Sequence, residues 1–219
     1  MGGDDSTAAS GTLPIFPLTG VLLLPGGRLP LNVFEPRYLN MVNDALSQDR
    51  MIGMVQPKER HRDPIPGDAP IFPVGCAGRI VSFAETEDGR VLITLMGTSR
   101  FRVASEVPSP RGYRRVVADF SPFAADLDGE AGRIDARDEL LATLKIYFRV
   151  RGMDADWETI EKADDDALIT SLSMACPFDP DEKQALLECG TTAERGRMLA
   201  ALMEMAVLTA DERGSSARH

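Results

Sequence analysis

Few residues of this sequence could carry out chemistry, and their spacing argues against an enzyme. There are two histidines, His61 and His219, and three cysteines, Cys76, Cys176 and Cys189. The number of cysteines is odd, and no two are spaced like the ligands of a metal clip. A histidine-based triad or zinc site would depend on His61 alone. We therefore expect no metal, buried reduced thiols and a cytoplasmic protein.

The sequence signatures of nucleotide and protease chemistry are absent. No Gly-Lys dipeptide occurs, so there is no G-x-x-x-x-G-K-[ST] phosphate loop, and neither H-E-x-x-H nor C-x-x-C is present. The terminal GSSAR has the composition of a frayed tail and does not predict the sharp turn that exposes a serine nucleophile. A glycosidase-type pair of carboxylates stays open, because their separation in the fold is invisible in a sequence. The sequence predicts no cofactor and no catalytic activity.

Two groups of charged residues have a suggestive spacing. Residues 164–166 are three consecutive aspartates that could attract a cation. Consecutive side chains at a helix start point in different directions, so we predict a helix cap and a complement to the helix dipole. Glu35 and Arg37 flank Pro36, where a helix is expected to begin. They either contact a partner or form an exposed ion pair that contributes little to stability.

The net charge of the chain comes from its second part. Residues 1–122 contain 13 Lys and Arg against 13 Asp and Glu, whereas residues 123–219 contain 11 against 21. Because nucleic-acid binding depends on Lys and Arg that neutralise phosphates, we expect no nucleic-acid partner. No apolar run reaches the roughly 18 residues of a membrane span, and the first residues lack the basic and apolar regions of a secretory signal. We therefore expect no membrane partner.

The first part of the chain has the patterns of β-strands. Phe101 alternates with Arg100 and Arg102, as in a strand with one solvent-facing side. The dipeptide Asp88-Gly89 is a signal for a two-residue hairpin turn. Short apolar or β-branched runs predict strands at 51–56, 78–85, 91–96, 100–104 and 113–120.

Residues 13–42, LPIFPLTGVLLLPGGRLPLNVFEPRYLNMV, are mostly apolar but are interrupted by five prolines. Prolines occur at strand ends, edges and bulges, so we predict three short strands in IFPL, VLLLP and LPLNVF. Pro36 suits the first position of a helix. The apolar face of that helix would hold Tyr38, Met41, Val42 and Ala45. Residues 57–71 have the composition of a surface loop.

The second part of the chain has the 3.6-residue period of helices. Apolar stripes begin at Leu140, Leu168 and Met198, and capping signals occur at Asp179 and Thr191. The Met-rich last stripe is interpreted as core rather than as a partner-binding surface. The sequence thus predicts an α+β fold, with a β-rich part that contains one helix, followed by a helical bundle. The predicted parts are a disordered tail (1–12), a β-rich part (13–122), a linker (123–132), a helical part (133–210) and a second disordered tail (211–219).

Three stretches of the chain resemble the N-terminal domain of Lon proteases, a family that also includes stand-alone bacterial proteins. They occur in the family's order over residues 13–208. They are the opening PIFPLTGVLLLPGGRLPLNVFEPRYLNMVNDAL, then VGCAGRIVSFAETEDGRVLITLMGTSRFRV (74–103) and DPDEKQALLECGTTAERGRMLAALME (179–204). The resemblance implies a PUA-like β pseudo-barrel followed by a helical bundle. The ATPase phosphate loop and the Ser-Lys protease dyad of Lon are missing from this chain. It therefore implies a non-catalytic module that binds unfolded or partly folded polypeptides, with a protease as a further expected partner.

A polypeptide-binding surface needs exposed apolar groups with a polar rim. We expect this surface in the opening stretch, although the same apolar residues could simply be core. The candidates are Leu22, Leu24, Leu29, Phe34, Glu35, Arg37 and Tyr38. The alternatives are a small-ligand or RNA-binding module, as in PUA-like folds elsewhere, and an undetected hydrolase with a deep polar pocket.

Overall fold

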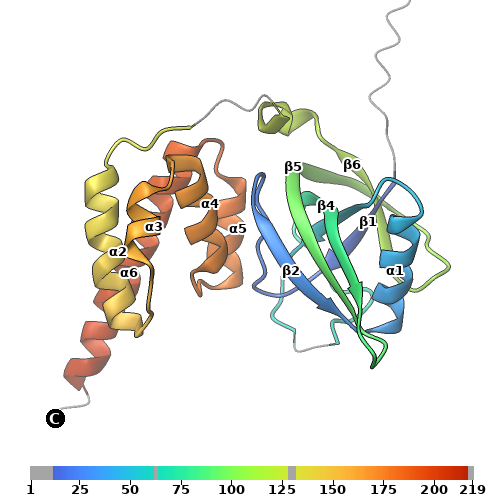
Figure 1. The fold of residues 1–219 in the computed structure, drawn as a ribbon, viewed down its shortest axis with the longest axis horizontal. Coiled ribbons are helices and arrows are strands. Elements are labelled where there is room, and N and C mark those ends of the chain that lie inside the picture. Colours follow the sequence, from blue (N-terminus) through green and yellow to red (C-terminus); the bar gives the residue numbers. More distant parts are fainter. Residues whose placement is uncertain (1–11, 62–63, 128–131, 217–219) are drawn as a thin grey trace, which may run out of the picture. The chain divides into compact units, whose positions relative to one another are not determined.

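The computed structural model describes residues 12–61, 64–127 and 132–216. The chain divides into two units, Met1–Gly129 and Glu130–His219, which we call the β unit and the helical unit (Figure 1). The division falls within the segment 123–132, which the sequence predicts to be a linker. The expected tail at 1–12 lies, apart from its last residue, outside the described residues.

The β unit is a barrel of five strands with a sixth strand attached. The sheet order is β2-β5-β4-β3-β1-β6, and an additional pairing between β5 and β6 closes the barrel, so that β2 lies outside it against β5. β1 and β3 run parallel, and all other pairs are antiparallel. The strands are β1 (Thr12–Pro17), β2 (Arg28–Val33), β3 (Met51–Val55), β4 (Val74–Glu85), β5 (Val91–Val107) and β6 (Arg114–Asp119).

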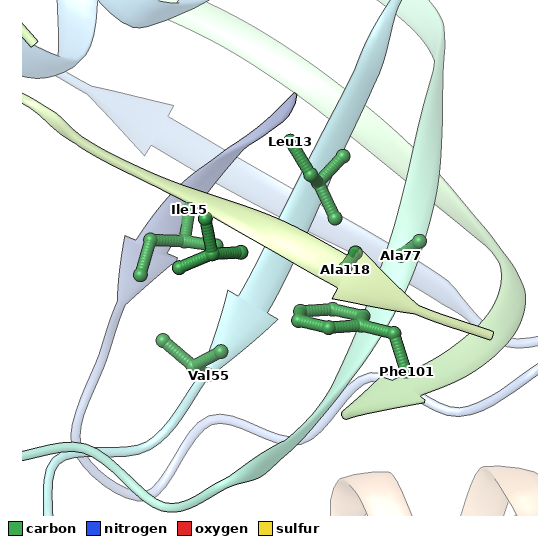
Figure 2. Close-up of a cluster of buried hydrophobic side chains, with 7 residues drawn as sticks. Leu13, Ile15, Val55, Ala77, Phe101 and Ala118 are labelled. Atoms are coloured by element: carbon green, nitrogen blue, oxygen red, sulfur yellow. The ribbon is translucent and has the colours of Figure 1, made fainter. Parts of the chain in front are cut away.

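The barrel interior is filled by apolar side chains from five strands, shown in Figure 2. The fully buried ring of Phe101 lies against two glycines. A Cβ atom at Gly53 or at Gly75 would lie 2.8 Å from that ring, so only glycine fits there without movement. The members of the cluster are Leu13, Ile15, Val55, Ala77, Phe101, Val116 and Ala118.

The opening stretch contains two of its three predicted strands. β1 and β2 confirm the first and the third, but residues 21–24 form no strand, and the prediction for VLLLP is wrong. The reason is a backbone contact with β5. A Cβ atom at Gly97 would lie 2.0 Å from the carbonyl oxygen of Leu24, and that oxygen also accepts a hydrogen bond from Gly27 N (2.9 Å). The backbone packs against β5 and then turns, so it does not pair along a neighbour.

The predicted helix in the β unit is confirmed. Helix α1 (Pro36–Leu46) begins at Pro36, and its buried residues are Tyr38, Met41, Val42 and Ala45. In the loop predicted at 57–71, the described residues form only one isolated bridge, between Pro57 and Ile71.

The strand predictions at 91–96 and 100–104 are joined in the structure. Together they form β5, a single strand of 17 residues. The predicted solvent-facing side of this segment is wrong at Arg100, which is buried and paired with Asp126 (Nη2 to Oδ1, 2.6 Å). Asp126 belongs to the 3₁₀ helix η1 (Ser121–Leu127), which begins within the β-rich part and covers the first residues of the predicted linker.

The turn before β5 is also longer than predicted. Thr86 N donates to Arg90 O (3.0 Å), and Gly89 N donates to Thr86 O (3.0 Å). The hydrogen-bonded pair Thr86–Arg90 therefore encloses three residues, 87–89, with Gly89 at a positive φ of 80°.

The helical unit has five helices among its described residues. The predicted stripes supply its core, including Leu144, Ile169 and Leu199. Met198, by contrast, is 38% exposed, so the Met-rich stripe is only partly core. α6 also extends into the segment 211–219, where a tail was expected. The helices are α2 (Arg137–Arg151), α3 (Trp157–Lys162), α4 (Asp165–Ala175), α5 (Pro180–Glu188) and α6 (Thr192–Ser216).

The α+β fold class predicted from the sequence is confirmed by this arrangement. Within the described part of the chain, none of the helices combines the length and the apolar composition that crossing a bilayer requires.

Candidate functional site

The β unit has a small pocket where β1, β2 and the start of α1 meet. Its volume is about 90 Å³, and most of its lining side chains are apolar. Two polar residues, Asn32 and Glu35, complete the lining. The lining residues are Phe16, Leu18, Leu31, Asn32, Val33, Phe34, Glu35 and Tyr38. An apolar hollow with a few polar groups can hold a single apolar side chain of a partner.

Two buried aromatic rings give the pocket a rigid wall. Phe16 of β1 and Tyr38 of α1 have ring centroids 4.1 Å apart at an angle of 38°. Both residues are at least 95% buried. Aromatic rings in contact stabilise each other beyond the burial of their area, so we expect this wall to keep its shape without a partner.

Phe34 is the large apolar residue at this pocket that stays in water. It is 57% exposed, although Val33 before it is buried. Only Phe34 and Glu35 connect β2 to α1, and Pro36 restricts the backbone of Glu35 before it. The connection is therefore too short for the ring to be withdrawn into the core.

Glu35 and Arg37 form an ion pair, with Arg37 Nε donating to Glu35 Oε2 (2.9 Å), but the pair is half-buried and not exposed as the sequence suggested. Arg37 Nη2 also donates to the carbonyl oxygen of Ile65 (2.7 Å), and the guanidinium lies 4.5 Å from the ring centre of Tyr38. Arg37 thus ties the loop at Ile65 to the start of α1. These contacts hold Glu35 and Tyr38, which line the pocket. They give the Arg37 side chain a structural role that requires no binding partner.

The structure separates the seven predicted site residues. Phe34, Glu35 and Tyr38 line one pocket, whereas Leu22 and Leu24 are buried elsewhere in the core. Their expected exposure is wrong, because the backbone contact with Gly97 holds this segment inside the unit. Tyr38 is also buried, at 4% exposure. Leu29 is half-buried on β2, opposite Leu95 of β5.

Sequence reasoning missed the other residues of the pocket. Phe16, Leu18 and Leu31 line it from β1, the residue after β1, and β2. Their apolar character was visible in the sequence, but nothing local indicated that these segments meet. The only available signal was the short connection between the predicted strand and the helix at Pro36.

Two groups of the helical unit that could react, Cys176 and Lys183, are buried. Burial raises the pKa of the Cys176 thiol to about 12, so the thiol stays protonated at neutral pH and is a weak nucleophile. Burial also lowers the pKa of Lys183, whose Nζ donates to the carbonyl oxygen of Met174 (3.1 Å). No group of three potential metal ligands occurs in the parts of the chain that the structure describes.

Comparison with known families assigns the chain. A family model described as the ATP-dependent protease La (LON) substrate-binding domain matches residues 12–205. The chain belongs to this family. The match spans both the β unit and the helical unit, and it confirms the resemblance seen in the sequence.

Lon proteases are among the relatives of this chain, and solved structures of Lon N-terminal domains share its fold. The chain is 29% identical over 195 residues to Lon protease of Parabacteroides distasonis, covering 86% of this chain and 23% of that protein. It therefore spans about a quarter of the length of such relatives. A Lon N-terminal domain protein from Xanthomonas campestris has the same fold, with a TM-score of 0.62 at 22% identity, over 87% of this chain and 98% of that one. The N-terminal domain of a Mycobacterium avium complex Lon protease gives a TM-score of 0.60 at 19% identity, over 89% and 98%.

Proposed function

We propose that this chain is a non-catalytic module that binds unfolded or partly folded polypeptides through the pocket beside Phe34. The observation that carries the proposal is the exposed Phe34 ring beside an apolar pocket with a rigid aromatic wall. The description of the family as a substrate-binding domain supports the same class of ligand. Exposed apolar groups at a preformed hollow are the usual mark of such a site.

The proposal includes a role in proteolysis, because the similar full-length proteins are Lon proteases. The bound polypeptides would then be substrates that pass to a protease. Crosslinking in cells followed by identification of the co-purified proteins tests this part. Recovery of a protease together with its substrates supports it, and recovery of RNA alone contradicts it. The balanced charge of residues 1–122 gives no support to the RNA-binding alternative.

Replacing Phe34 by serine tests the pocket directly. A suitable ligand is reduced, carboxymethylated α-lactalbumin, which stays unfolded. We expect its affinity to fall about tenfold, which corresponds to about 1.4 kcal/mol of lost apolar contact. The free energy of unfolding should change by no more than about 0.5 kcal/mol, since the side chain is already exposed.

Leu127→Ser is the matched control, because Leu127 is 69% exposed in the same unit but does not line the pocket. This variant should bind like the unchanged protein. Equal affinity of the Phe34 and Leu127 variants would remove the pocket from the proposal. A loss of several kcal/mol of stability in the Phe34 variant would show that the ring belongs to the core.

A further inference from the structure

Strand β4 continues beyond the end of its neighbour β3. The two strands pair where Met51–Met54 lie opposite Cys76–Arg79, and the last bond on this side runs from Ile80 N to Arg50 O (2.8 Å). From Ser82 to Glu85, β4 pairs only with β5. One side of residues 81–85 is therefore not paired with any strand that the structure describes.

The backbone groups on this open side follow from the hydrogen bonds of the hairpin. Thr86 N donates to Arg90 O, so the amide of Thr86 points toward β5. Amide directions alternate along a strand, so those of Phe83 and Glu85 point away from β5. The pairing register shifts between Ile80 and Ser82. The amides of Phe83 and Glu85 therefore lie on the same side of β4 as the amide of Ile80, which donates to Arg50 O. The open edge thus presents backbone donors and acceptors at residues 83 and 85.

Apolar side chains accompany this edge. On β4, Val81 is 48% exposed and Phe83 is 40% exposed, whereas Leu92 (44% exposed) lies one strand away from the edge, on β5, and on the opposite face from Phe83. All residues from 81 to 85 are exposed, and Glu85 is the only charged one among them. Natural proteins usually protect such edges with proline or lysine, or cover them with another segment. Residues 81–85 contain no proline and no lysine, and their exposure shows that no described segment covers them.

The other outer strand, β2, shows what a protected edge looks like in the same unit. Gly97 N donates to Gly27 O (2.8 Å), and the register then directs the amides of Leu29 and Leu31 toward β5. The outward position between them is Pro30, which has no N–H to offer. The edge of β2 is therefore blunted at its centre, and the edge of β4 is not.

We infer that residues 81–85 of β4 accept an extended segment of a bound polypeptide as an additional strand. The inference rests on the proposed polypeptide binding and names how the ligand is held. Main-chain hydrogen bonds at residues 83 and 85 provide affinity for any sequence, and Val81 and Phe83 favour apolar side chains. Recognition of this kind suits a ligand that is defined by being unfolded.

The side chain of Phe83, at the open edge, and the pocket beside Phe34 lie on the same face of the sheet. Ile93 of β5 is opposite Leu31 of β2 and also opposite Phe83 of β4, so the three side chains share a face. Leu31 lines the pocket. Two strand spacings, about 10 Å, separate Leu31 from Phe83. One polypeptide can therefore reach both places, with a strand on β4 and an apolar side chain in the pocket.

The size of the edge favours a polypeptide over a second copy of this chain. An aromatic side chain offers about 150–250 Å² in total, so the two apolar side chains of the edge, each less than half exposed, provide a few hundred Å² at most. A stable interface between folded proteins needs about 800 Å² on each partner. Five residues of open edge match a short extended segment.

Hydrogen exchange and a proline variant test the inference, with reduced, carboxymethylated α-lactalbumin as the probe. The exchange rates of the Phe83 and Glu85 amides should fall at least tenfold when the probe is added. In Glu85→Pro, which removes an outward N–H and no bond to β5, affinity for the probe should fall about tenfold. Arg28→Pro removes an outward N–H from β2 and is the matched control, with unchanged affinity expected.

The outcomes separate this inference from the proposed function. Binding that depends on Phe34 but leaves both amides unprotected, with normal affinity in Glu85→Pro, overturns the strand addition alone. No binding of the probe to the unchanged protein overturns both. Protection that appears without the probe and grows with protein concentration shows pairing of two copies and also overturns the inference. If Glu85→Pro does not fold, the exchange measurement on the unchanged protein decides.

Discussion

In the β unit, β1 and β6 pair although they are far apart in the sequence, whereas in the helical unit α4 and α5 begin with contacts between near neighbours. Thr12 of β1 pairs with Val117 of the neighbouring strand β6. In the helical unit, Asp164 caps α4 by accepting from Ala167 N (2.8 Å), and Asp179 N donates to Glu182 Oε2 (2.7 Å) at the start of α5. A single bad contact should therefore damage the barrel more than the bundle, where stability comes from many local terms.

The units can be followed separately because the only tryptophan belongs to the helical unit. Trp157 lies in α3, with its ring 5.7 Å from that of Phe148. Its fluorescence reports the helical unit, and hydrogen exchange in β4 and β5 reports the β unit.

The largest effect is expected for Gly97→Ala. The new methyl group would lie 2.0 Å from Leu24 O and 2.8 Å from Leu24 C, and backbone atoms have no easy way to move aside. We expect the β unit to lose several kcal/mol of stability, seen as fast exchange in β4 and β5. The control is Gly67→Ala, where no atom lies within 4 Å of the new Cβ and stability should not change. Equal exchange in both variants would show that the barrel tolerates the contact.

A buried and an exposed ion pair, one in each unit, give the next comparison. Arg100 and Asp126 in the β unit are 5% and 8% exposed, whereas Arg197 and Asp135 in the helical unit are 63% and 78% exposed. Asp126→Ala leaves a buried guanidinium without its carboxylate and should cost about 3–5 kcal/mol. Asp135→Ala should cost less than about 1 kcal/mol. Denaturant midpoints measured with the probe of each unit test this order, and similar costs would contradict it.

A smaller effect is expected at the cap of α4. Asp164→Ala removes the acceptor for Ala167 N and should cost about 1 kcal/mol, read from the Trp157 fluorescence midpoint. Asp154→Ala, at an exposed position outside the helices, should leave the midpoint unchanged. A cost of several kcal/mol at Asp164 would mean that the helical unit is as sensitive to single contacts as the barrel.

The smallest effect is expected in the acid response of the helical unit. The hydrogen bond from Ile134 N (3.0 Å), together with Arg137, lowers the pKa of Asp165 below its usual value near 4. The folded state therefore gains stability that is complete above the unfolded pKa and is lost as the pH falls through the folded pKa. Asp165→Asn should flatten the dependence of the Trp157 midpoint on pH below 4. A slope identical to that of the unchanged protein would argue against this contribution.

The sequence was informative wherever the deciding contacts are local. The buried face of α1 and the cap at Asp164 follow from residues within two turns of each other, and both predictions were confirmed. The burial of Leu24 depends on Gly97, and that of Arg100 depends on Asp126. Nothing in the sequence around Gly97 or Asp126 indicates that these residues make the deciding contacts.

The candidate site was predicted in part for the same reason. Phe34 and Tyr38 are both large and aromatic and lie four residues apart, yet one is 57% exposed and the other is 4% exposed. Tyr38 lies on the helix face that packs against Phe16, whereas Phe34 lies in the two-residue connection before the helix. The different exposure of Phe34 and Tyr38 therefore follows from the way β1, β2 and α1 pack together, which the local sequence does not show.

The pairing of β1 with β6 also fixes when the barrel can close during synthesis. Val117, the partner of Thr12, leaves the ribosome only after about a hundred further residues have been added. At about 5–20 residues per second, this takes roughly 5–20 s. Throughout that interval the apolar opening stretch has no β6 to pair with. A protein proposed to bind unfolded chains therefore exposes an unpaired edge of its own β1 during synthesis, even after β3, the other neighbour of β1, has been made.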